Sequence, residues 1–152
     1  MVIHNRVNTT YDRDMPAWKA RAAQLMTGPE VVFGHEQARV CEAGIREVAQ
    51  THDLRVHAAA IMRTHLHVVV GSPSREGEDV LKLFKGVLSR RLGQHFAKPV
   101  SGKWWTRHGS HRLLTNDASF LGAVRYILRE QENPLAIITL DDPETRDQSP
   151  AG

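Results

Sequence analysis

Apolar positions along the chain change their period several times, and each period predicts a type of secondary structure. Positions that recur every three to four residues predict helices, and positions that alternate predict strands. The strands are expected at Ile3–Thr9, Leu54–Met62, His65–Gly71 and Trp104–Leu114. The helices are expected at Glu36–His52, Glu78–Phe96 and Ala118–Gln131. Residues 11–34 are expected to be irregular, because they contain the breakers Pro16, Gly28, Pro29 and Gly34.

The order of these elements predicts the fold class. Strand, helix, strand, strand, helix and strand follow one another, as in the split βαβ, ferredoxin-like arrangement. We therefore expect an α+β fold, an antiparallel sheet with helices on one face, and in addition a C-terminal helix. Residues 1–140 are expected to form a single domain. Residues 141–152 form an acidic tail with Pro143 and Pro150, which we expect to be flexible.

Composition narrows the class of protein. The chain has 152 residues, of which 41% are hydrophobic and 24% charged, as in soluble globular proteins. Its longest apolar run is Ala58–Met62, whereas a membrane-spanning helix needs about 20 residues. A single cysteine, Cys41, excludes a disulfide framework and a zinc site built on cysteines. With no secretory signal recognisable, we expect a cytoplasmic protein without a membrane partner.

Charge is unevenly distributed along the chain. The net charge is +3, yet residues 82–112 contain eight lysines and arginines and no acidic residue, so the remainder carries −5. Such a stretch attracts polyanions, although a solvated basic face without a partner is the simpler alternative. Aromatic and basic residues also lie close together in Trp104–His108, which favours base stacking, or else a core anchored by the tryptophans. The residues expected to bind nucleic acid are Lys82, Lys85, Arg90, Arg91, Lys103, Trp105 and Arg107.

Two histidines, His65 and His67, are separated by one residue on an expected strand. Residues i and i+2 of a strand point to the same face, so both imidazoles can bind one divalent metal ion while Leu66 enters the core. The spacing alone is weakly specific, and two ordinary strand histidines are the alternative.

Tyr126 lies on the last expected helix, near the edge of its apolar stripe. It is either an amphipathic side chain at the margin of the core or a nucleophile activated by a metal-polarised phosphate. Attack on a phosphodiester would form a phosphotyrosine and release a 3′ hydroxyl. Glu130 and Gln131 follow one turn later, where either oxygen could complete a metal site or simply face solvent. Because a phosphotyrosine keeps the energy of the phosphodiester bond, such cleavage would be reversible and no nucleotide cofactor is expected. The chain has no Walker-type loop, nucleophile elbow or His-Glu-x-x-His segment.

Together these motifs resemble a known family. The strand with His65-Leu66-His67, the helix with Leu-Lys-x-Phe-Lys-Gly, the Trp-rich strand and the helix with Tyr126-Ile127 ending near Asn133-Pro134 occur in this order. This combination is similar to the single-tyrosine HUH transposases of small bacterial insertion sequences and to the REP-associated tyrosine transposases. The resemblance extends from Arg55 to Pro134 and is weaker across residues 3–54.

The resemblance implies a function and a set of roles. Members have a ferredoxin-like fold, act as homodimers and cut single-stranded DNA with Mg²⁺ or Mn²⁺ through a 5′-phosphotyrosine. By this resemblance His65 and His67 are the metal ligands and Tyr126 is the nucleophile. The family's third ligand, often glutamine four residues after the tyrosine, corresponds to Glu130, with Gln131 one residue further. Thr64 stands where an asparagine is frequent. Two alternatives stay open: a catalytically silent binder of single-stranded nucleic acid, and a metal-dependent phosphodiesterase that uses water.

Overall fold

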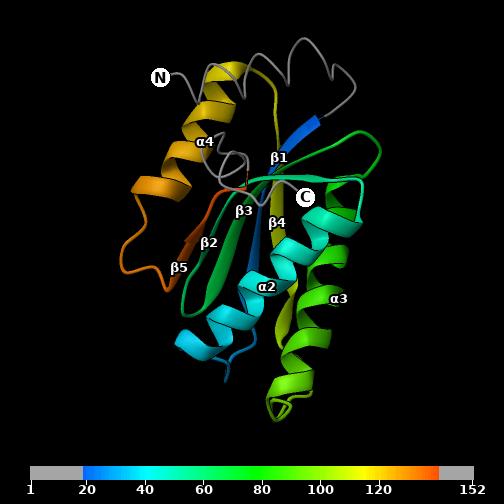
Figure 1. The fold of residues 1–152 in the computed structure, drawn as a ribbon, viewed down its shortest axis with the longest axis vertical. Helices are drawn as coiled ribbons and strands as arrows, with labels where there is room; N and C mark the ends of the chain where they lie inside the picture. The colour runs from blue at the N-terminus through cyan, green and yellow to red at the C-terminus, as the bar shows by residue number, and fades with distance from the viewer. Residues whose placement is uncertain (1–18, 141–152) are drawn as a thin grey trace, which may run out of the picture.

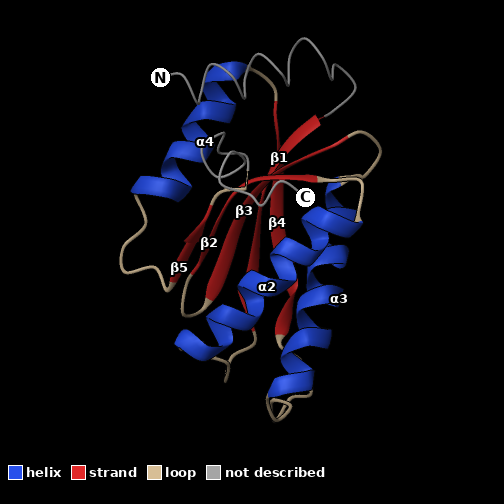
Figure 2. Ribbon diagram, in the orientation of Figure 1, coloured by secondary structure: helices blue, strands red, loops and turns tan. Residues whose placement is uncertain are grey.

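The computed structural model describes residues 19–140 as one five-stranded sheet with three helices (Figures 1 and 2). The strands are β1 (Lys19–Thr27), β2 (Arg55–Ile61), β3 (His65–Ser72), β4 (Trp105–Leu114) and β5 (Ala136–Ile138). The helices are α2 (His35–Thr51), α3 (Gly77–His95) and α4 (Asp117–Arg129). The expected strand Ile3–Thr9 and the acidic tail 141–152 lie outside the described residues. Between residues 19 and 140, no helix combines the length and the apolar character needed to cross a membrane.

The sheet has the order β4-β1-β3-β2-β5, and every neighbouring pair of strands is antiparallel. The chain order β1-α2-β2-β3-α3-β4 is the split βαβ arrangement that the sequence predicts. The α+β fold class is therefore confirmed. The short strand β5, which the sequence did not predict, pairs with β2 and extends the sheet at that edge.

The helices form two layers on opposite faces of the sheet. Helices α2 and α3 pack side by side against one face, and α4 lies against the other (Figure 1). The larger core lies under α2 and α3 and includes Phe33, Ile45, Leu66, Phe84, Leu88 and Leu92. The smaller core lies under α4 and includes Ala58, Ala60, Val69, Phe120, Val124 and Ile127. Because successive residues of a strand face opposite sides, the strands β1 to β4 each contribute to both cores.

Strand β1 corrects one prediction from the sequence. Residues 11–34 were expected to be irregular, which is wrong over Lys19–Thr27, because this segment forms a central strand. Its composition is rich in alanine and polar residues, so its intrinsic strand propensity is low. It becomes a strand because it pairs with β3 on one side and with β4 on the other. Tertiary pairing thus outweighs local propensity in this segment.

The ends of α4 fix its position over the sheet. At its start the Asn116 carboxamide accepts a hydrogen bond from the Ser119 backbone N–H at 2.8 Å and so caps the helix. After its last residue, Asn133 adopts a positive φ of 53°, a conformation that asparagine tolerates better than most residues. The chain then reverses, and the Leu135 N–H bonds the Ile61 carbonyl at 2.8 Å. This return ties the end of α4 to the end of the sheet where His65 lies, since Ile61 pairs with Leu66.

Candidate active site

The two histidines of β3 lie together on the α4 side of the sheet. Leu66 between them is fully buried in the core under α2 and α3, as the strand period predicts. The imidazole rings of His65 and His67 have their centroids 4.7 Å apart and are nearly perpendicular. The Thr64 hydroxyl oxygen is 3.4 Å from Nδ1 of His65. The predicted same-face pair is therefore formed.

Burial keeps both imidazoles in the neutral state near pH 7. Partial burial lowers the pKa of His65 below its ordinary value. For His67, burial and then the neighbouring His65 lower the pKa to about 4. A neutral imidazole has one ring nitrogen with a free lone pair, which is the form that binds a metal ion. The electrostatics of the pair thus fit metal ligation.

Tyr126 extends from α4 beside these histidines. The neighbouring residues Val124 and Ile127 are buried against the sheet and fix the helix there, while Tyr126 is 47% exposed. Its ring centroid lies 5.9 Å from that of His67, with the two planes nearly perpendicular. The structure therefore brings the predicted nucleophile to the predicted histidine pair within a single chain.

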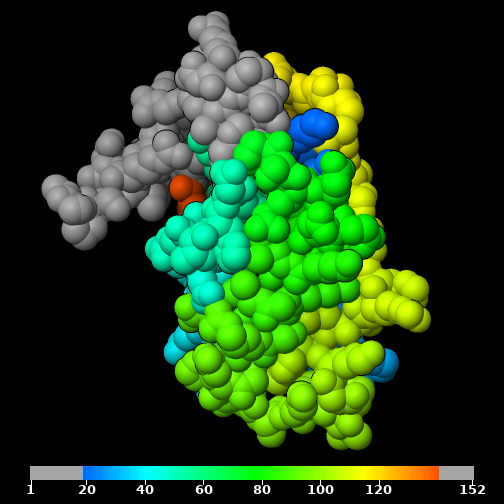
Figure 3. Space-filling model, turned by 90° about the vertical axis from the view of Figure 1, so that its right-hand side faces the viewer, coloured from blue at the N-terminus to red at the C-terminus, as the bar shows by residue number. Residues whose placement is uncertain are grey.

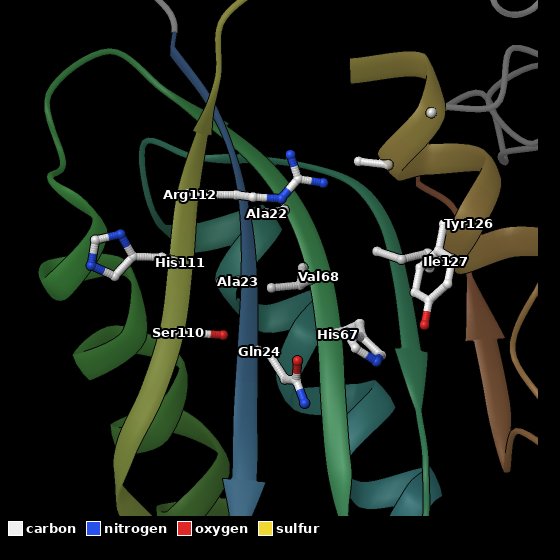
Figure 4. A pocket seen from close by; sticks show the side chains of 12 residues that line it. Ala22, Ala23, Gln24, His67, Val68, Ser110, His111, Arg112, Tyr126 and Ile127 are labelled. Atoms are coloured by element: carbon white, nitrogen blue, oxygen red, sulfur yellow. The ribbon is translucent and has the colours of Figure 1, made fainter. Parts of the chain in front are cut away.

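A groove of about 450 Å³ opens next to this contact, between α4 and the strands β1, β3 and β4. His67 and Tyr126 line one end, and three polar side chains that the sequence did not single out extend into it: Gln24, Ser110 and Arg112 (Figure 4). The register of the sheet explains their proximity, because Gln24 pairs with His67 on one side and with Ser110 on the other. The sequence did not reveal these three residues as part of the site, because β1, the strand that links β3 to β4, was not predicted. The ring of His111, by contrast, points away from the groove and lies 3.6 Å from a Glu78 carboxylate oxygen.

The two candidates for the third metal ligand differ in their surroundings. Glu130 ends α4 as its C-cap and is exposed. Among residues 19–140, no three His, Cys, Asp or Glu side chains come close enough together to hold a metal ion, so Glu130 does not join His65 and His67. Gln131 is partly buried, and its side-chain amide nitrogen is inaccessible and has no hydrogen-bond partner among residues 19–140.

The predicted nucleic-acid-binding residues separate into engaged and free groups. The Lys85 ammonium donates to the Thr106 carbonyl at 2.9 Å, and Arg90 and Arg91 both pair with Glu47 of α2. These cations join elements of the fold. Lys82, Lys103 and Arg107 are exposed and form no ion pair with another described residue. Much of the predicted charge is therefore available to a partner.

The burial of Trp105 favours a core anchored by the tryptophans over base stacking. It is only 5% exposed, and its ring packs edge-on against Phe33 with the centroids 5.5 Å apart. It is a core residue, because the start of β4 lies over the larger core. A hollow of about 480 Å³ nevertheless lies beside it, between α3 and the segment 96–104, and includes the cations Lys85, Arg90, Lys98 and Lys103. These two parts of the chain form one exposed surface, in green and yellow-green in Figure 3.

Comparison with known proteins identifies the family. Residues 29–128, well over half of the chain, match the family model described as "Transposase IS200 like". The chain belongs to the IS200-like transposase family. The match includes His65, His67 and Tyr126 but ends before Glu130 and Gln131. No curated protein matches this IS200-like transposase.

Solved structures share its fold. One is a REP-associated tyrosine transposase bound to a REP hairpin, with a TM-score of 0.57 and 12% identity. The alignment covers 72% of this chain and 64% of the REP-associated transposase. A second, from Deinococcus radiodurans and provisionally described as a transposase, has a TM-score of 0.54 and 21% identity. This second alignment covers 75% of the present chain and 90% of the Deinococcus protein. At these identities the likeness establishes the fold alone.

Proposed function

We propose that this IS200-like transposase nicks and rejoins single-stranded DNA, with Tyr126 as the nucleophile. The observation that carries the proposal is the 5.9 Å separation of the Tyr126 and His67 rings at one end of an open groove. A tyrosine that only completed the core would be buried like its neighbour Ile127, yet Tyr126 is 47% exposed. The side chain is thus accessible to a polymer that lies in the groove.

The reaction is a transesterification at phosphorus. The phenolic oxygen of Tyr126 attacks the scissile phosphate, the bond from phosphorus to the 3′ oxygen breaks, and a 5′-phosphotyrosine forms. The phenol loses its proton, and the departing 3′ oxygen gains one and leaves as a hydroxyl. Because the phosphodiester is conserved in the tyrosine ester, attack by a 3′ hydroxyl reverses the step and joins DNA without a nucleotide cofactor.

His65 and His67 fit a bound Mg²⁺ or Mn²⁺ ion. Both rings are on one face, and both are neutral near pH 7, so each can direct a nitrogen lone pair to the same ion. When bound, such an ion polarises the scissile phosphate and stabilises the charge that develops on it. Imidazole together with oxygen ligands suits a borderline ion such as Mn²⁺, and further oxygen ligands favour Mg²⁺.

We assign the third ligand to Gln131 in preference to Glu130. The support is the buried amide nitrogen of Gln131, which has no hydrogen-bond partner in the described part of the chain, whereas Glu130 faces solvent. A buried polar group without a partner is costly unless a ligand satisfies it. The nitrogen and oxygen of an amide are exchangeable by rotation about one bond, so the oxygen can take the buried position. Gln131→Ala should weaken Mn²⁺ binding about tenfold or more, and Glu130→Ala should leave it unchanged.

The site is complete within one chain in this proposal, even if the protein is a homodimer. The support is that Tyr126 and His67 of the same chain are already in contact. Mixing Tyr126→Phe with His65→Ala subunits tests this. Absence of cleavage in the mixture is expected, whereas restored cleavage would mean that the helix with Tyr126 is exchanged between subunits.

The DNA backbone is proposed to follow the basic surface formed by α3 and the segment 96–104. Lys98 and Lys103 are the best probes, because Lys85, Arg90 and Arg91 also hold parts of the fold together. Replacing both with alanine should weaken binding of single-stranded DNA and reduce the magnitude of the slope of log affinity against log salt concentration by about 1.4, since two fewer phosphates are neutralised and fewer counterions are released. An unchanged slope would mean that Lys98 and Lys103 do not contact the DNA backbone and that the DNA follows another surface.

One experiment tests the function. The protein is incubated with random-sequence single-stranded DNA and Mn²⁺, and a denaturing gel is examined for a covalent complex. We expect an adduct with the unmodified protein and none with Tyr126→Phe. Cleavage without an adduct, retained in Tyr126→Phe, would indicate a phosphodiesterase that uses water. DNA binding without cleavage would indicate a catalytically silent binder.

A further inference from the structure

The groove beside Tyr126 is shaped by small side chains. Ala22 of β1 and Ala123 of α4 line it where larger residues would fill it. Gly122 lines it as well, and a side-chain carbon built there would meet no atom within 4 Å. The resulting space of about 450 Å³ is in the range of pockets that bind small ligands. A single nucleotide unit of a DNA strand is a ligand of this size.

The guanidinium of Arg112 extends from β4 into this groove (Figure 4). It forms no ion pair or hydrogen bond with another residue in the part of the chain that the structure describes. By comparison, Arg21, Arg90 and Arg91 are each paired with a glutamate. An arginine without a protein partner beside a phosphodiester site is suited to bind a phosphate through two hydrogen bonds.

Gln24 provides a group that can distinguish bases. It lies in the centre of the sheet between His67 and Ser110, and the side chains of all three line the groove (Figure 4). Within the described residues its amide nitrogen donates to the sulfur of Met26, at 3.1 Å, and to no other acceptor, and a thioether is a weak acceptor. A side-chain amide offers one donor and one acceptor together, which matches the edge of one base better than those of the others.

We propose that this groove binds one nucleotide that flanks the scissile phosphate, with Arg112 on its phosphate and Gln24 on the edge of its base. The proposal rests on the proposed function and adds a specificity-determining residue to it. Gln24 acts on the choice of base, and Arg112 acts on all sequences alike. The catalytic residues Tyr126 and His67 remain as described.

The test uses single-stranded oligonucleotides that carry each of the four bases at each position next to a cleavage site mapped with the unmodified protein. We expect the unmodified protein to prefer one base at one flanking position by about tenfold. Gln24→Ala should reduce that preference to less than about twofold at this position only. Gln24→Glu, which keeps the shape and removes the donor, should favour a base with an exocyclic amino group. Arg112→Ala should raise KM equally for all four bases, and Arg112→Lys should restore part of the loss.

Matched controls lie on the opposite layer. Gln50→Ala and Arg39→Ala replace exposed residues of the same types on α2 and should change neither the preference nor KM. Equilibrium binding to the same oligonucleotides, measured with the Tyr126→Phe protein, provides a readout that does not need cleavage. If DNA binds and the preference survives in Tyr126→Phe/Gln24→Ala, the groove proposal is overturned and the proposed function stands. If the unmodified protein neither binds nor cuts single-stranded DNA, both are overturned.

Discussion

The two faces of the sheet differ in the size and polarity of the side chains that they contribute. Under α2 and α3 the strands present large apolar residues such as Leu25, Leu66 and Val70, which pack against Phe33, Ile45, Phe84 and Leu88. Under α4 the same strands present alanines and polar groups, among them Ala58, Ala60, Gln24 and His67. One face is covered by a large apolar core, and the other leaves a groove.

This difference indicates a division of labour between the layers. Burial of large apolar groups stabilises the fold, so most of the stability is expected to come from the α2–α3 layer. Histidines that are only half-buried, and small residues that leave space, contribute little to stability. They are retained where a ligand has to enter. Neighbouring residues of β3 therefore allow the two roles to be separated by single substitutions.

The largest expected effect is on the groove face. His67→Ala should reduce DNA cleavage by about a thousandfold or more, because a metal ion contributes several kcal/mol to transition-state stabilisation. Its effect on the free energy of unfolding should be small, since the ring faces the groove. Single-turnover cleavage and urea denaturation measure the two quantities. A variant that unfolds would instead make His67 a structural core residue.

For Leu66, which precedes His67 on β3, we expect a large loss of stability and little loss of cleavage. Leu66→Ala removes a fully buried side chain from the larger core and should lower the free energy of unfolding by about 2–5 kcal/mol. Cleavage per folded molecule should be retained if the two faces are independent. Urea denaturation gives the first quantity, and an assay at low temperature, where most molecules stay folded, gives the second. Equal losses of cleavage in Leu66→Ala and His67→Ala would contradict the division.

The same substitution, glycine to alanine, can be made at an exposed helix position in each layer, so its effects in the two layers can be compared directly. Gly86 of α3 and Gly122 of α4 both have free space where a side-chain carbon would lie. Replacing either with alanine should raise the free energy of unfolding by about 0.5–1 kcal/mol, through helix propensity. Only Gly122→Ala should slow cleavage, because Gly122 lines the groove. Thermal denaturation and cleavage assays of the two variants provide the comparison, and equal activity would argue that the groove is not used.

The smallest expected effect concerns the ion pairs within the α2–α3 layer. Hydrogen bonds from Arg91 and Arg90 lower the pKa of Glu47 below its ordinary value. A carboxyl with a lowered pKa stabilises the folded state above the unfolded pKa of 4.5, and this contribution is lost as the pH falls through the folded value. Glu47→Gln should therefore reduce stability at pH 7 only modestly, and the difference from the unmodified protein should vanish in acid. Urea denaturation at several pH values measures it, and a difference that persisted in acid would exclude the charge as its cause.

Much of the fold was predictable because its signals are local. The helices α2, α3 and α4 and the strands β2, β3 and β4 were expected within a few residues of their bounds. Strand β1 was not, since its alanine-rich sequence has little preference of its own, and β5 is too short to show a pattern. Trp105 was expected at a DNA surface, yet it is buried, because a cluster of aromatic and basic residues does not reveal which side of an edge strand is covered.

The sequence by itself determined which residues share a face within one element. Strand geometry has a period of two, so His65 and His67 had to be together and opposite Leu66 wherever β3 lay. Tertiary structure alone decided what meets across elements. The sheet register brings Gln24, Ser110 and His67 into one row, and the packing of α4 brings Tyr126 to it. These contacts join residues far apart in the chain, so they depend on the pairing of strands and the docking of a helix, which no local pattern encodes.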